Sequence, residues 1–242
     1  QLQRILHREW LRIAYGDLVR KQNPDTVLEQ TSYLYEGLLA AAFQVAVSST
    51  AASKDSNLTD QFVVIALGDL AANQMCYGDT VKIMMLYDEP KASTANSHDS
   101  AFGNVLDKVL TKTLALLTAS SGEPLFTVDI SFPLSNNESS PATNLHAAVR
   151  YLDFSGRTWQ RCALIGARSC VGNTELGAEF LRRIDKWIYH RYPSRADMTG
   201  LRSQKRRLYR TDLTGSVALD MQATPGATAD IVAVIQFIQL LN

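Results

Sequence analysis

The sequence predicts an α+β protein with a small mixed sheet flanked by helices, preceded by N-terminal helices and followed by the start of a helical bundle. Residues 62–67 and 81–87 are short apolar runs rich in β-branched side chains, which is typical of strands buried on both faces. A third strand is expected over 125–132, where apolar and polar residues alternate, so Asp129 should point away from the apolar face.

The helices are predicted from apolar spacing and from turn signals. Residues 1–20 carry apolar side chains at helical intervals, and residues 23–26 supply a turn and a cap for a long second helix over 27–47. Further helices are expected at 101–119, 158–168, 173–189, 196–209 and 230–241. Small and polar residues predict loops at 48–57, 91–100 and 133–144.

The composition excludes several classes of function. Lys and Arg together number 24, as do Asp and Glu, so no net charge favours nucleic acid or an anionic membrane as partner. The three cysteines lack CxxC spacing and the four histidines are scattered, which argues against a zinc site or a disulfide framework. No stretch approaches the roughly 18 apolar residues of a membrane span, and the start has no signal-peptide pattern. We expect a cytoplasmic fragment of a longer chain.

The stretch from Ile65 to Tyr87 reads Ile-Ala-Leu-Gly-Asp-Leu-Ala-Ala-Asn-Gln-Met-Cys-Tyr-Gly-Asp-Thr-Val-Lys-Ile-Met-Met-Leu-Tyr. It resembles a segment of the glutamine synthetase adenylyltransferases. That family has a strand, a Gly-Gly turn, a short helix, a Ser-Asp-x-Asp motif and a second strand at the same spacing. The match needs no gap.

A second stretch resembles a helix of the same family. Residues 159–168 read Trp-Gln-Arg-Cys-Ala-Leu-Ile-Gly-Ala-Arg, and the family has Trp-Glu-Arg-x-Ala-Leu-x-x-Ala-Arg. Residues 11–18, 127–129 and 230–241 follow in the family's order, so the resemblance covers nearly the whole chain.

The resemblance implies a nucleotidyltransferase fold and a divided chain. We expect an N-terminal helical region at 1–57, a nucleotidyltransferase-like domain with associated helices at 58–215, and the start of a C-terminal helical bundle at 216–242. Members carry two such domains, one that attaches AMP to a tyrosine of glutamine synthetase and one that removes it by phosphorolysis. The run over 180–192 looks more like the AMP-removing, N-terminal half.

The resemblance also implies Mg²⁺ and ATP or ADP as cofactors, because nucleotidyl transfer needs about two metal ions to clamp the phosphates. The family's metal-binding acids match Thr80, Lys82 and Asp129, so only Asp129 remains as a metal ligand and is insufficient alone. At an effective dielectric of about 20, an ammonium about 4 Å from a divalent cation meets roughly 8 kcal/mol of repulsion. We expect weak or no cofactor binding, and a salt bridge between Lys82 and Asp129. Rescue by Asp79 is disfavoured because alternation puts it on the opposite face.

Other positions with expected roles in phosphate binding have changed as well. The family's Gly-Gly turn is Ala71-Ala72, and the Arg-Glu after it is Asn73-Gln74. Where the family has an arginine-rich segment after the third strand, this chain has Ile-Ser-Phe-Pro at 130–133. Where the family closes with Gly-Gly-Ile-Arg-Asp-Ile-Glu, this chain has Gly-Ala-Thr-Ala-Asp-Ile-Val at 226–232. The candidate nucleotide-binding positions are Gly68, Ala71, Ala72 and Arg161.

Three functions stay open at this point. The first is an inactive domain with a regulatory or scaffold role, whose partners are glutamine synthetase, its signalling proteins or a sister catalytic domain. The second is an active enzyme that adenylylates or deadenylylates glutamine synthetase. The third is nucleotide binding without catalysis, through Lys82 or Arg161. Trp159, Arg161 and Arg168, expected on one helix, could contact nucleotide or brace the fold, and the basic run 205–207 could bind an anion or be solvated.

Overall fold

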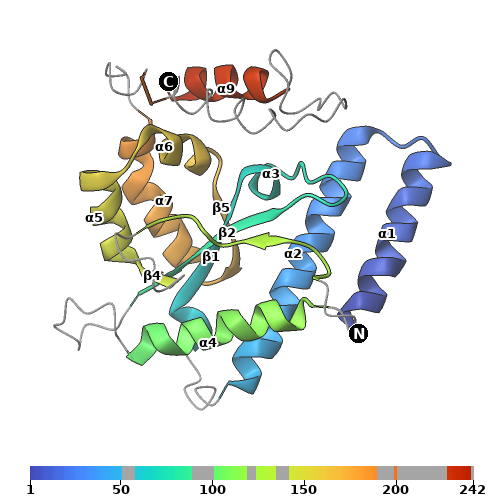
Figure 1. Cartoon of the computed structure of the whole chain (residues 1–242), viewed down its shortest axis with the longest axis horizontal. Coiled ribbons are helices and arrows are strands. Elements are labelled where there is room, and N and C mark those ends of the chain that lie inside the picture. Colours follow the sequence, from blue (N-terminus) through green and yellow to red (C-terminus); the bar gives the residue numbers. More distant parts are fainter. Residues whose placement is uncertain are drawn as a thin grey trace, which may run out of the picture.

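The computed structural model describes residues 1–50, 58–88, 101–118, 124–134, 142–189, 199–200 and 228–240. A small sheet lies at the centre, with helices packed on both of its faces (Figure 1). This is the expected α+β layout, and it is consistent with a nucleotidyltransferase fold. Among the described helices, none is long and apolar enough to cross a membrane.

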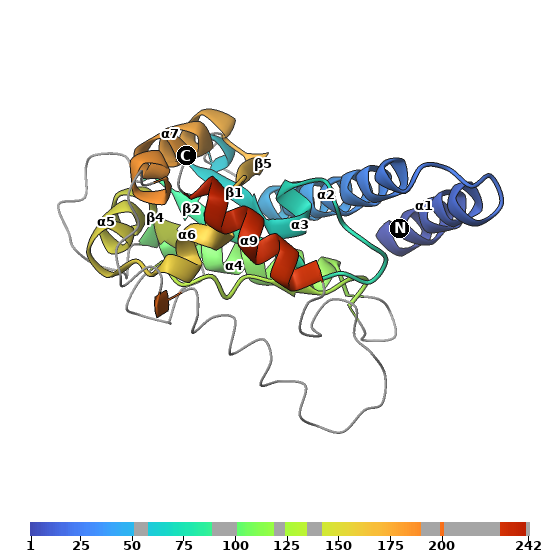
Figure 2. The ribbon, with the colours of Figure 1, turned by 90° about the horizontal axis from the view of Figure 1, so that it is seen from above.

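Two long helices open the chain. α1 (Leu2–Leu18) packs along α2 (Pro24–Ser49), and the pair stands at one side of the molecule (Figures 1 and 2). α2 begins at Pro24 rather than at the expected residue 27. Asn23 caps it, because its side chain accepts a hydrogen bond from the Asp25 amide at 3.1 Å and Pro24 occupies the first turn.

The sheet contains β1 (Phe62–Leu67), β2 (Val81–Tyr87), β3 (Val128–Asp129), β4 (Ala142–Asn144) and β5 (Arg168–Gly172). β1 pairs antiparallel with β2 and with β5, whereas β3 and β4 pair parallel with successive parts of the free edge of β2. The sheet is therefore mixed, as expected.

The two faces of the sheet are covered by different helices. α1, α2 and α4 (Ala101–Leu116) share one apolar cluster with Phe62, Val64 and Ala66 of β1. α5 (Leu145–Ser155), α6 (Thr158–Leu164) and α7 (Thr174–Ile188) supply most of the helical side chains of the other cluster, which includes Val63 and Ile65. Every residue of β1 is buried for this reason, which explains its continuous apolar sequence.

Three short elements complete the described structure. A 3₁₀ turn, η2 (Leu58–Asp60), precedes β1, and the one-turn helix α3 (Gly68–Ala71) follows it. α9 (Thr228–Gln239) is the last helix, and Leu240 behind it is buried in the second cluster.

Several expected boundaries are wrong, and pairing within the sheet explains them. The helix expected over 158–168 ends at Leu164, because Gly166 takes a φ of +69° and the chain turns back to pair with β1 as β5. The strand expected over 125–132 is ladder-paired only at 128–129, and β4 and the start of α5 occupy the end of the expected 133–144 loop and the residues after it. The expected loop 91–100, most of the helix expected over 196–209, the basic run 205–207 and residues 226–227 lie outside the described residues.

Candidate functional site

Strand register brings the two central candidate residues into one row at the end of the sheet. Lys82 on β2 pairs with Leu67 of β1 on one side and with Asp129 of β3 on the other. Lys82 is exposed and Asp129 half-buried, while the flanking Val81 and Ile83 are buried on the α1–α2–α4 face. Thr80 precedes β2 by one residue, two positions before Lys82. The spacing expected for an acid pair is thus present, with Thr and Lys in place of the acids.

The turn after β1 lies next to Lys82. Gly68 takes a φ of +55°, and a Cβ placed on it would lie 4.0 Å from Lys82 Cδ, so the lysine stem leans over this turn. Ala71 ends α3 and Ala72 keeps a right-handed φ of −78°, so neither position requires glycine. The left-handed conformations fall instead on Gly68 and Asn73. The four-residue helix is formed with alanines at the two positions where the resemblance implies glycines.

The Asp129 side chain is hydrogen-bonded to Ser131, two residues further along the chain. Its Oδ1 accepts hydrogen bonds from the Ser131 amide at 2.9 Å and from the Ser131 hydroxyl at 2.5 Å. The hydroxyl hydrogen bond is the main reason why the pKa of Asp129 is lowered, with smaller lowering effects from the amide and from the Lys82 charge, against a raising effect of burial. The carboxyl group is therefore ionised at neutral pH.

The expected salt bridge between Lys82 and Asp129 is wrong as a direct contact. The ion pairs within 4.0 Å among the described residues join arginines to glutamates, and none includes either residue. Ser131 donates two hydrogen bonds to Asp129 Oδ1 instead. Lys82 affects the Asp129 carboxylate only through its charge.

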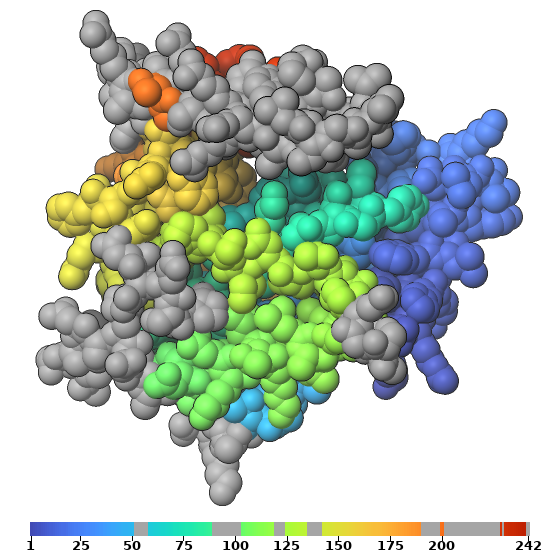
Figure 3. Space-filling model, viewed as in Figure 1, coloured from blue at the N-terminus to red at the C-terminus, as the bar shows by residue number. Residues whose placement is uncertain are grey.

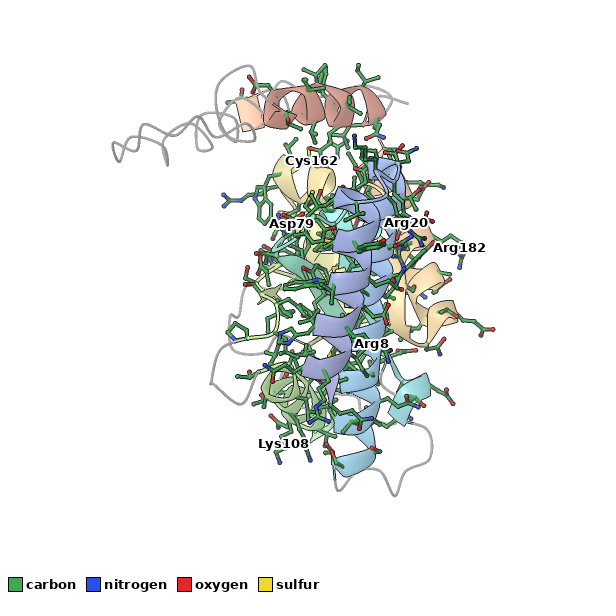
Figure 4. All side chains as sticks on the ribbon, turned by 90° about the vertical axis from the view of Figure 1, so that its right-hand side faces the viewer. Arg8, Arg20, Asp79, Lys108, Cys162 and Arg182 are labelled. Atoms are coloured by element: carbon green, nitrogen blue, oxygen red, sulfur yellow. The ribbon has the colours of Figure 1, made fainter. Side chains whose placement is uncertain are left out.

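Asp79 takes part in a local turn. Its Oδ2 accepts a hydrogen bond from the Cys76 amide at 2.7 Å, and its own amide donates to the Cys76 carbonyl at 3.4 Å. Figure 4 shows Asp79 near the C-terminal part of α1, and Tyr77 in the same loop donates to Asp17 of α1 at 3.3 Å. The carboxylate is thus engaged by the backbone of its loop, as expected for a residue that does not replace the lost acid. Cys76 in the same loop is exposed.

Arg168 braces the turn from the opposite face of the sheet. Its guanidinium donates to both carboxylate oxygens of Glu36 on α2, at 3.0 and 2.6 Å. It also donates to the carbonyls of Leu70 and Ala71 at 3.2 and 3.1 Å and to Asn73 Oδ1 at 2.9 Å. Of the two roles left open for Arg168, these contacts support bracing, and they do so from a strand rather than from a helix.

α2 fixes the rest of the loop between α3 and β2. The Ser32 hydroxyl accepts a hydrogen bond from the Met75 amide at 3.0 Å, and the Tyr35 hydroxyl accepts one from the Gly78 amide at 3.3 Å. Sequence reasoning missed Ser32, Tyr35 and Glu36. Their spacing on one side of a long helix was the available signal, but nothing in the sequence says which distant loop they face.

Arg161 and Trp159 also make packing contacts. The buried Arg161 donates through Nε and Nη2 to the Ile188 carbonyl at the end of α7, at 3.0 and 2.8 Å. The Trp159 ring lies edge-on to Phe132, with centroids 5.7 Å apart. A contact of Arg161 with nucleotide stays a prediction.

The comparison with known proteins adds what geometry alone does not give. The family pattern described as glutamate-ammonia ligase adenylyltransferase matches residues 1–183. The chain belongs to this family. It is similar to the bifunctional glutamine synthetase adenylyltransferase/adenylyl-removing enzymes of Brucella suis (23% identity over 228 residues), Nitrosococcus oceani (22% over 248) and Corynebacterium glutamicum (28% over 194).

These alignments cover 90%, 100% and 78% of the chain, but only 23%, 26% and 18% of the respective relatives. The chain therefore spans about a quarter of the length of the curated relatives it matches.

The residues at the positions where the resemblance implies metal-binding acids do not fit a pair of Mg²⁺ ions. Mg²⁺ prefers carboxylate oxygens, and Asp129 is the single carboxylate among Thr80, Lys82 and Asp129. One of its oxygens already accepts two hydrogen bonds from Ser131. Within the described ranges, no group of three His, Cys, Asp or Glu side chains could hold a metal ion. The described residues at this site therefore provide too few ligands for a metal-dependent step.

Proposed function

We propose that this chain is a degenerate, catalytically inactive nucleotidyltransferase domain of the glutamine synthetase adenylyltransferase family, with a regulatory or scaffold role. The observation that carries the proposal is Lys82. It is in register with Asp129 at the sheet end, where the resemblance implies an acid, and it leans over the turn after β1.

The charge at this site supports the proposal. Thr80 and Lys82 in place of two acids change the local charge by +3. Catalysis of phosphoryl transfer depends on cations held next to the phosphates, and an ammonium in that space raises the free energy of a bound cation. Asp129 stays ionised but is bonded to Ser131, so it offers reduced capacity for a metal.

The retained architecture supports a role that needs the fold but not the reaction. Ser32, Tyr35 and Arg168 hold the loop and the turn in place through contacts that involve no metal. The partners that we propose are glutamine synthetase, its signalling proteins or a sister catalytic domain, and we propose that the chain acts in the cytoplasm. The relatives named above are bifunctional adenylyltransferase/adenylyl-removing enzymes, and resemblance favours the adenylyl-removing half for this copy.

Two measurements test the proposal. Calorimetry with ATP or ADP and Mg²⁺ should give no metal-dependent binding in the micromolar range. Incubation with glutamine synthetase and labelled ATP, and with adenylylated glutamine synthetase and phosphate, should give neither label transfer nor phosphorolysis. Activity in either direction, with Mg²⁺ or Mn²⁺, would refute the proposal.

The matched variant is Thr80→Asp combined with Lys82→Asp. Both positions are at or near the exposed end of β2, so the variant should fold. Metal-dependent nucleotide binding in the variant alone would attribute the loss to these two residues. Binding in neither protein would place the cause elsewhere in the domain, for instance at Ala71 and Ala72.

The alternative is an active nucleotidyltransferase that uses Asp129 with unconventional ligands. The ionised state of Asp129 is the observation in its favour. Asp129→Asn separates the two ideas, because it should abolish any activity of an enzyme but leave an inactive scaffold domain unchanged in partner binding.

A further inference from the structure

The outward face of α1 carries an apolar stripe that no described element covers. Leu11, Tyr15 and Leu18 recur at intervals of four and three residues, with exposed fractions of 73%, 53% and 77%, and Val19 after the helix is 62% exposed. The opposite side of α1 is the packed one, where Leu6 and Ile13 are buried. The stripe is therefore additional to the apolar side that holds α1 on α2.

The position of α1 makes the stripe accessible. α1 forms the outer edge of the molecule, beyond α2, in Figures 1 and 2, and the same edge stands out in the space-filling view of Figure 3. Figure 4 looks onto this helix from outside, with Arg8 and Arg20 labelled along it. The spacing of Leu11, Tyr15 and Leu18 extends over about 10 Å of helix, which is enough to form a ridge for packing against another helix.

The charge around the stripe is positive, although the chain as a whole is neutral. Residues 1–21 contain five Lys and Arg residues and two acids, for a net charge of +3. Both acids are already engaged, since Glu9 accepts from Arg8 and Arg12 and Asp17 accepts from Tyr77. Arg20 lies over the Tyr15 ring, 5.6 Å from its centroid.

We propose that this face, defined by Leu11, Tyr15, Leu18 and Val19, is the docking surface for an amphipathic helix of a partner protein whose apolar side is bordered by acidic residues. The charge favours an acidic partner and disfavours a second copy of this chain, because two faces with a net charge of +3 repel each other. The proposal is independent of whether the domain is catalytically active.

The docking surface is connected to the candidate site. Asp17 lies on a different side of α1 from Tyr15 and Leu18, and it accepts the Tyr77 hydroxyl from the loop that contains Asp79 and Thr80. The same loop is bonded to α2 through Tyr35. α1 therefore joins the docking surface on its outer side to the loop that contains Asp79 and Thr80.

The test uses the whole chain and two designed helical peptides of about four turns, both with leucines at the spacing of the stripe. One peptide has glutamates beside the leucines, and the other has lysines. Fluorescence anisotropy should show binding of the acidic peptide, weakened by added salt, and at least about tenfold weaker binding of the basic peptide.

Leu11→Glu combined with Leu18→Glu should weaken binding of the acidic peptide by about 30-fold, as expected when interface hot spots are lost. Both side chains are mostly exposed, so circular dichroism melting should match the wild type. Phe154→Glu is the control, because Phe154 is 86% exposed on α5, away from α1, and its substitution should leave peptide binding unchanged. Arg4→Glu combined with Arg8→Glu should shift the preference toward the basic peptide.

Three results would overturn the proposal. The first is equal binding, or no binding, of the two peptides. The second is a dimer in analytical ultracentrifugation that the Leu11→Glu/Leu18→Glu variant abolishes, since the face would then pair with a second copy. The third is binding to phosphatidylserine vesicles, lost in the same variant, without peptide binding, which would make the face a membrane contact.

Discussion

Arg168 should be the most costly polar side chain to remove at the candidate site. Arg168→Met deletes two hydrogen bonds to the Glu36 carboxylate, two to backbone carbonyls of the turn after β1 and one to Asn73. Breaking a fully buried charge pair costs roughly 3–5 kcal/mol. The side chains of Arg168 and Glu36 are 31% and 21% exposed, so solvent screening reduces the expected loss to about 2–3 kcal/mol in the free energy of unfolding.

Urea denaturation followed by circular dichroism measures this loss. A double-mutant cycle with Glu36→Gln should give a coupling energy of about 1–2 kcal/mol, because the two residues contact each other directly. Arg182→Gln is the control, since Arg182 is 76% exposed and its partner Glu179 lies on the same helix, and it should leave the urea midpoint unchanged. A loss below about 0.5 kcal/mol for Arg168→Met, or independent effects of the two substitutions, would refute the bracing role.

Three further predictions concern other residues. Removing the two hydrogen bonds from Arg161 to the Ile188 carbonyl by Arg161→Met should lower the free energy of unfolding by about 1.5–3 kcal/mol, measured in urea. Because the pKa of Asp129 is lowered in the folded state, its contribution to stability is present above its unfolded pKa of about 3.9 and is lost as the pH falls through the folded pKa. Asp129→Asn should therefore flatten the acid limb of a plot of urea midpoint against pH, and an unchanged limb would contradict the assignment. A thiol reagent such as dithionitrobenzoate should react with Cys76 in the native protein and with all three cysteines after unfolding. The reaction of Cys76 should become faster as the pH rises, because partial desolvation and the nearby acids Asp79 and Asp69 raise the pKa of its thiol.

The sequence predicted the parts of the fold that rest on local patterns. β1, β2 and the long helices α1 and α2 lie at or close to their expected positions, because apolar runs and apolar spacing decide them. β5 was missed because its residues, Arg-Ser-Cys-Val-Gly, have no strand pattern of their own and form a strand only by pairing with β1. The expected third strand was too long because β3 and β4 share the same edge of β2, which leaves β3 two ladder-paired residues.

The candidate site likewise has a part that the sequence could predict and a part that it could not. The row of Lys82 and Asp129 could be predicted, because alternation along two strands decides which side chains share a face. The brace could not, because Glu36 and Arg168 are separated by 132 residues and their contact depends on how α2 crosses the sheet. The direct contact between Lys82 and Asp129 failed for a local reason, since Ser131 is two residues away and competes for the carboxylate without any cost of ordering a long lysine side chain.

The residues on the two sides of the turn after β1 thus have different roles. On one side lie Thr80, Lys82 and Asp129, where the resemblance implies metal-binding acids. On the other side, Arg168 and Glu36 hold the turn through contacts that need neither metal nor nucleotide. Stability depends on the second set, so the first set can change without loss of the fold. A domain built this way can change at Thr80 and Lys82 and keep the outer face of α1 unchanged, so the proposed binding role does not depend on the chemistry of that site.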